Sequence, residues 1–124
     1  MAYVLVFLGG GFGSVLRHIV NVLTGRLFGL NYPIGTFTVN VTGSLVMGLF
    51  AGYFAFKGDA SQSWRLLLMT GVLGGYTTFS AFSLDTMLLY ERGMMGSAAL
   101  YAIASVVLSV GALAAGLGLA RHFS

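Results

Sequence analysis

The sequence predicts an all-α integral membrane protein, a single domain built from four transmembrane helices. Of its 124 residues, 57% are hydrophobic and only 7% are charged. A soluble domain carries about 25% charged residues, so six basic and three acidic side chains cannot supply a water-facing surface, and a soluble enzyme is excluded. The second observation that predicts this fold is the presence of four long apolar stretches, each with the roughly 20 residues that a helix needs to cross a bilayer.

The ends of the four predicted spans, and the few charged residues within them, can be identified in the sequence. The first carries Arg17 and His18 near its end, and the second opens at Pro33, which suits a first helical turn, and stops at Lys57. The third holds one acid, Asp85, and the fourth has no charged side chain. Their continuous apolar runs favour helices over the alternating strands of a membrane β-barrel. Within the single domain, residues 1–124, the spans are 2–24, 33–56, 66–90 and 94–120.

The six basic side chains are scattered singly and form no patch that would bind nucleic acid. Basic residues normally mark the cytoplasmic side of a membrane protein, but here three fall on each side. Charge therefore fixes no orientation, and dual topology is expected unless the N-terminal amine or a partner protein supplies a weak bias. One side holds Lys57, Arg65 and Arg121, and the other holds Arg17, Arg26 and Arg92.

The third span predicts a helix broken near its middle. Gly74 and Gly75 are followed by four hydroxyl residues within a short stretch, which is unfavourable for a continuous helix. In transporters and channels, such breaks build ion sites because they free backbone carbonyls and amides. The alternative is close helix packing through glycine without a break, since Gly71 and Gly75, like Gly9 and Gly13, have the four-residue spacing of packed membrane helices.

Polar and aromatic residues inside the spans are the candidates for a pathway. Asn40 either clamps two helices together, worth about 1 kcal/mol, or donates hydrogen bonds to a permeating species. Phe79 and Phe82 share a helix face. They are either ordinary packing residues or rings whose positive edges contact an anion. Ser80 and Ser83 lie on an adjacent face and have hydroxyl protons to donate.

The last span carries a polar stripe, Tyr101, Ser105 and Ser109, at four-residue intervals. The stripe either lines a path or consists of hydroxyls bonded to carbonyls of their own helix. Arg17 either extends to the membrane interface or attracts anions to a vestibule. The sequence gives no support for enzyme chemistry. No span holds paired carboxylates, and the chain has no Cys and no group of His residues at the spacing of metal ligands.

Along its whole length the chain resembles the small bacterial fluoride channels known as Fluc or CrcB. The matching segments are Gly9 to Arg17, Gly35-Thr36 through Val39-Asn40 to Gly43-Ser44, Gly74-Gly75-Tyr76-Thr77-Thr78-Phe79-Ser80-Ala81-Phe82-Ser83, and Glu91-Arg92-Gly93. His18 departs from the pattern, because relatives often have a bulky aromatic residue after the arginine.

The resemblance implies an antiparallel, dual-topology homodimer in the bacterial inner membrane, with two pores that export fluoride passively. It also implies a structural sodium ion, not transported, held by main-chain carbonyls of Gly74 and Thr77 from both protomers. The fluoride path that it implies is formed by Asn40, Phe79, Phe82, Thr78, Ser80, Ser83, Tyr101, Ser105 and Ser109.

Two rival functions fit the length and span count. A small dual-topology, proton-coupled drug exporter needs an acid in its first span, but residues 2–24 contain none, and Asp85 lies close to the end of the third span. The other rival is a purely structural accessory subunit without a pore.

Overall fold

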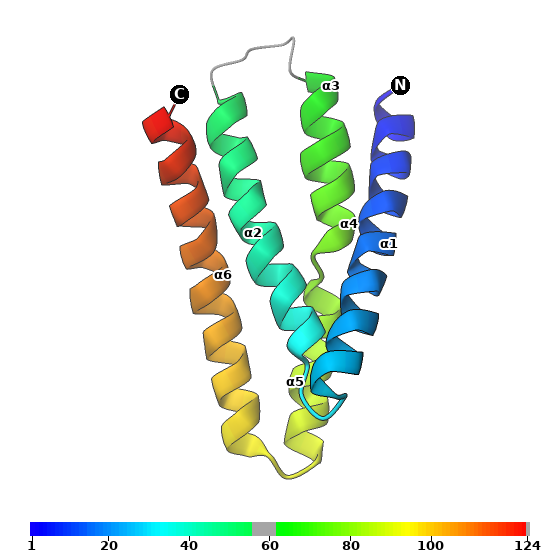
Figure 1. Cartoon of the computed structure of the whole chain (residues 1–124), viewed down its shortest axis with the longest axis vertical. Helices are drawn as coiled ribbons and strands as arrows, with labels where there is room; N and C mark the ends of the chain where they lie inside the picture. Colours follow the sequence, from blue (N-terminus) through cyan, green and yellow to red (C-terminus); the bar gives the residue numbers. More distant parts are fainter. Residues whose placement is uncertain (56–61, 124) are drawn as a thin grey trace.

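The computed structural model describes residues 1–55 and 62–123, and within this part of the chain four helices are long and apolar enough to cross a membrane. Figure 1 shows them aligned along the long axis of the molecule, with both termini at the same end. The all-helical, four-span prediction is confirmed. Lys57, the predicted end of the second span, lies outside the described residues. The uninterrupted helices are α1 (Ala2–Phe28), α2 (Ile34–Phe54) and α6 (Met95–Phe123).

The third span is interrupted at Thr77 and Thr78. Both residues have extended backbone, with ψ 159° at Thr77 and φ −153°, ψ 121° at Thr78. The predicted break is confirmed, but it follows the glycines: Gly74 and Gly75 are still helical. The first half comprises α3 (Gln62–Trp64), the π-helical η2 (Arg65–Leu73) and α4 (Gly74–Tyr76), and the second half is α5 (Phe79–Glu91).

Glycines bring α1 into direct backbone contact with the first half of the third span. A Cβ atom on Gly13 would collide with the Val72 carbonyl and lie 2.9 Å from the Tyr76 nitrogen. A Cβ on Gly75 would collide with the Gly10 carbonyl. Because only glycine permits these approaches, α1 lies along this half-helix as far as its end at the break.

The same principle joins α2 to α6, where Gly48 meets the Leu113 carbonyl and Gly116 meets the Leu45 carbonyl. Elsewhere most large apolar side chains are exposed, for example Phe7 and Ile103. Such exposure suits a protein whose solvent is lipid. Main-chain packing through small residues therefore sets the positions of the spans.

Candidate functional site

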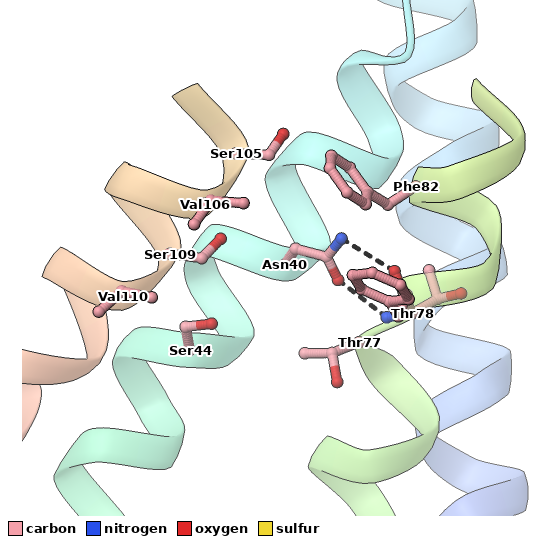
Figure 2. A pocket seen from close by; sticks show the side chains of 10 residues that line it. Asn40, Ser44, Thr77, Thr78, Phe82, Ser105, Val106, Ser109 and Val110 are labelled. Carbon is pink, nitrogen blue, oxygen red and sulfur yellow. Dashed lines mark hydrogen bonds between the residues drawn. The ribbon is translucent and has the colours of Figure 1, made fainter. Parts of the chain in front are cut away.

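The break is clamped by Asn40 of α2. Its Nδ2 donates to the Thr78 carbonyl at 3.0 Å, and its Oδ1 accepts from the Thr78 backbone N–H at 2.8 Å. Figure 2 shows this pair of bonds at the edge of the pocket. Two main-chain groups that an extended residue would leave unpaired in the membrane are thereby satisfied. The interhelical clamp expected for Asn40 is present, and one Nδ2–H has no partner among the described residues.

The clamp and the cap of α5 together release two carbonyls. In a continuous helix the Thr78 N–H would donate to the Gly74 carbonyl, but it donates to Asn40 instead. The Ala81 N–H would donate to the Thr77 carbonyl, but it donates to the Thr78 Oγ1 at 3.1 Å, a side-chain cap of α5. The Gly74 and Thr77 carbonyls are thus freed by specific side chains.

A pocket of about 270 Å³ opens beside the clamp, between α2, α6 and the break. In Figure 2, α6 faces the pocket from one side and the third span from the other, with Asn40 and Ser44 of α2 between them. Six of the nine predicted path residues meet here, together with the predicted sodium ligand Thr77. The lining consists of Asn40, Ser44, Thr77, Thr78, Phe79, Phe82, Ser105, Val106, Ser109 and Val110.

The hydroxyl oxygens of the two serines in the α6 stripe are buried. Neither the Ser105 nor the Ser109 Oγ has a hydrogen-bond partner within the described part of the chain, although both atoms are shielded from solvent. The alternative in which these hydroxyls bond to their own helix is wrong. Because an unpaired buried hydroxyl costs about 1–3 kcal/mol, two of them beside one pocket point to a polar species as its occupant.

Three aromatic rings form a row that begins at the pocket. The Phe79 and Phe82 centroids are 5.5 Å apart, and those of Phe82 and Tyr101 are 5.4 Å apart. Tyr101 lies outside the first pocket, and its hydroxyl donates to the Asp85 carboxylate at 3.3 Å. Asp85 lines a second pocket of about 300 Å³ between α1, α2 and α5, together with Thr36.

Ser80, Ser83 and Arg17 are not among the residues that line these two pockets. The Ser80 and Thr78 hydroxyls lie 3.3 Å apart, and the Ser83 hydroxyl donates to the Phe79 carbonyl at 3.0 Å. Arg17 donates from Nε to the Gly75 carbonyl at 3.1 Å. The path roles that the resemblance implies for Ser80 and Ser83, and the vestibule role of Arg17, stay predictions.

Sequence reasoning missed three residues of the pocket wall. Ser44 belongs to a motif of the resemblance but not to the predicted path, and Val106 and Val110 belong to no predicted site. The signal for the valines was their position next to the serine stripe: each valine directly follows a stripe serine in the sequence. Because apolar residues flank the polar stripe on both sides, the sequence alone does not distinguish valines that face the pocket from valines that face lipid.

Comparison with known proteins identifies relatives along the whole chain. Residues 4–117 match the CrcB-like protein family, Camphor Resistance (CrcB). A Nitrobacter hamburgensis protein named Fluoride-specific ion channel FluC 2 is 66% identical over 124 residues, which is 100% of both chains. Proteins named Fluoride-specific ion channel FluC from Rhodopseudomonas palustris (strain BisB5) and Caulobacter sp. (strain K31) are 64% and 55% identical over 98% and 95% of this chain, and 98% and 93% of their own. The resemblance seen in the motifs is confirmed, and the chain belongs to the CrcB family.

Proposed function

We propose that this chain forms a fluoride channel of the bacterial inner membrane, through which fluoride leaves the cytoplasm passively and its toxicity falls. The observation that carries the proposal is the pocket at the break, where unpaired hydroxyls, one amide N–H and two aromatic rings meet. The printed names of the relatives support ion permeation rather than an enzymatic reaction.

The chemistry of this pocket suits a small anion. Moving such an ion into a low-dielectric medium unaided costs on the order of 20 kcal/mol in the idealised Born estimate, so donors must replace its water. Asn40 offers the N–H that the clamp leaves over, and Ser105 and Ser109 offer hydroxyl protons. The edges of Phe79 and Phe82 carry partial positive charge. Since none of the described residues that line the pocket carries a fixed positive charge, the anion is stabilised without being trapped.

The working unit that we propose is an antiparallel homodimer with two pores. Phe79 is 77% exposed on the single chain although it lines the pocket, so this wall is completed by another surface. Gly74, at the adjacent half-helix end, is exposed as well. A second copy in the opposite orientation covers both Phe79 and Gly74. The even division of basic residues between the two sides supports insertion in both directions.

We also propose that the break holds a structural sodium ion that is not transported. Its ligands are the main-chain carbonyls of Gly74 and Thr77 from both protomers. Hard oxygen atoms at a half-helix C-terminus suit a small cation, and both carbonyls have lost their helical donors to side-chain interactions. The bound ion supplies positive potential at membrane depth, which favours a passing anion.

Fluoride efflux from proteoliposomes tests the function. Vesicles loaded with potassium fluoride and containing the purified chain are diluted into fluoride-free buffer, and a fluoride electrode follows release after valinomycin is added. We expect rapid efflux without a proton gradient, and no comparable efflux from chloride-loaded vesicles measured with a chloride electrode.

Two results contradict the proposal. Absence of fluoride efflux with sodium present would indicate an accessory protein without a pore. Transport of organic cations that depends on a proton gradient would indicate the drug exporter. Crosslinking of single-cysteine variants, in a chain that has no natural Cys, then reports whether the two copies are antiparallel.

A further inference from the structure

Arg17 lies where α1 passes the end of the first half of the third span. Gly13 contacts Val72 and Tyr76 directly through the backbone, and Arg17 follows Gly13 by four residues, about one helical turn. Its partly buried Nε therefore reaches the Gly75 carbonyl, to which it donates at 3.1 Å. The close glycine contact and the hydrogen bond together fix the guanidinium at the break.

This bond replaces one that the break removes. In a continuous helix the Gly75 carbonyl would accept from the Phe79 N–H, but Phe79 begins α5 beyond the extended Thr77 and Thr78. A cation at a helix C-terminus is favourable because the last carbonyls point outward there. Within the described residues Arg17 pairs with no acidic side chain. Its charge is thus directed at the same half-helix end as the freed Gly74 and Thr77 carbonyls.

We propose that Arg17 sets the sodium affinity of the break, as a positioning residue that withdraws the Gly75 carbonyl from the ion and places a fixed positive charge beside the site. This inference rests on the sodium site of the proposed function. Guanidinium and sodium ion stabilise the same negative end of one half-helix, so each weakens the binding of the other. At an effective dielectric constant near 20, repulsion between two charges several ångström apart changes an affinity by about tenfold or more.

Removal of the charge has two opposite effects, depending on sodium. Without sodium, a neutral side chain at position 17 leaves the C-terminus of α4 without a countercharge, so the protein is less stable. With sodium, the ion meets no repulsion from the guanidinium and binds more tightly, and ligand binding to the folded state restores stability. The midpoint of sodium-dependent stabilisation should therefore move to lower concentration.

Three substitutions separate charge from hydrogen bonding. Arg17→Lys keeps the charge, Arg17→Gln keeps an N–H donor without charge, and Arg17→Met has neither. Arg26→Gln is the matched control, because it removes a positive charge from the exposed end of the same helix. Each protein is purified in sodium and exchanged into N-methylglucamine at constant ionic strength, and its thermal unfolding is measured as sodium is added back.

We expect the sodium midpoint to fall by about tenfold in Arg17→Gln and Arg17→Met, and to stay at the wild-type value in Arg17→Lys and Arg26→Gln. Equilibrium binding of radioactive sodium to protein kept folded at low temperature gives the same quantity for a variant that unfolds in N-methylglucamine. An unchanged midpoint in Arg17→Gln, with a normal wild-type response, overturns the inference alone. Absence of any sodium response in the wild type overturns the sodium site and this inference with it.

Discussion

Substitution of Asn40 separates the two tasks that the structure gives this side chain. In Asn40→Asp the carboxylate still accepts from the Thr78 N–H, but the bond to the Thr78 carbonyl at 3.0 Å is lost and two oxygens face each other. Loss of that partner costs about 1–3 kcal/mol. In Asn40→Leu both main-chain groups of Thr78 are orphaned, which doubles the cost to roughly 2–6 kcal/mol.

Asn40→Asp also places a negative charge beside the proposed fluoride path. A carboxylate in contact with the path repels an anion about 4 Å away by about 4 kcal/mol at an effective dielectric constant of 20, which corresponds to roughly a thousandfold lower rate. Electrode-measured efflux should therefore vanish, while size-exclusion chromatography and thermal unfolding show a folded protein.

The control is Asn31→Asp, the same change of charge in a loop residue outside the pocket, which should conduct normally. Wild-type efflux from Asn40→Asp would remove Asn40 from the fluoride path. Wild-type stability of Asn40→Leu would refute the clamp.

Three further predictions concern the pocket and the helix contacts. Ser105→Ala should slow fluoride efflux about tenfold yet raise thermal stability by about 1 kcal/mol, because it deletes a buried hydroxyl without a partner; lower stability would mean that the hydroxyl is bonded. Phe79→Ile should cut efflux severely, because it removes an aromatic ring edge from the pocket; unchanged efflux would mean that Phe79 is an ordinary packing residue. Gly13→Ala should destabilise the fold by several kcal/mol, because its Cβ collides with the Val72 carbonyl, whereas Gly11→Ala, which has nothing within 4 Å, should unfold like the wild type.

Asn40 and Arg17 stabilise the break, although the backbone at Gly74 and Gly75 is still helical. Each side chain takes over a main-chain group that the interrupted helix would otherwise leave unpaired, at Thr78 and at Gly75. In lipid no water is available for this purpose, so polar side chains from α1 and α2 must do it. The break is therefore a property of three packed spans, and the glycines serve mainly to let α1 approach.

Composition and periodicity determined the membrane class, the four spans and the interruption of the third. These features depend on local physics: apolar runs long enough for a bilayer, and a stretch rich in glycine and hydroxyl residues that weakens a helix. The stripe formed by Ser105 and Ser109 was visible from its spacing for the same reason.

Only the tertiary structure decided what the polar residues do. Whether Asn40 bonds to a backbone or to a permeating ion depends on how close Thr78 lies. That distance is set by the packing of two spans, because Asn40 and Thr78 are 38 residues apart in sequence. Likewise, the serine stripe could have bonded its own carbonyls, and Arg17 could have extended to the membrane interface. Side-chain partners across helices are set by packing, which local sequence does not specify, so the clamp, the unpaired hydroxyls and the Arg17 bond to Gly75 appear only when α1, α2, α6 and the broken span are brought together.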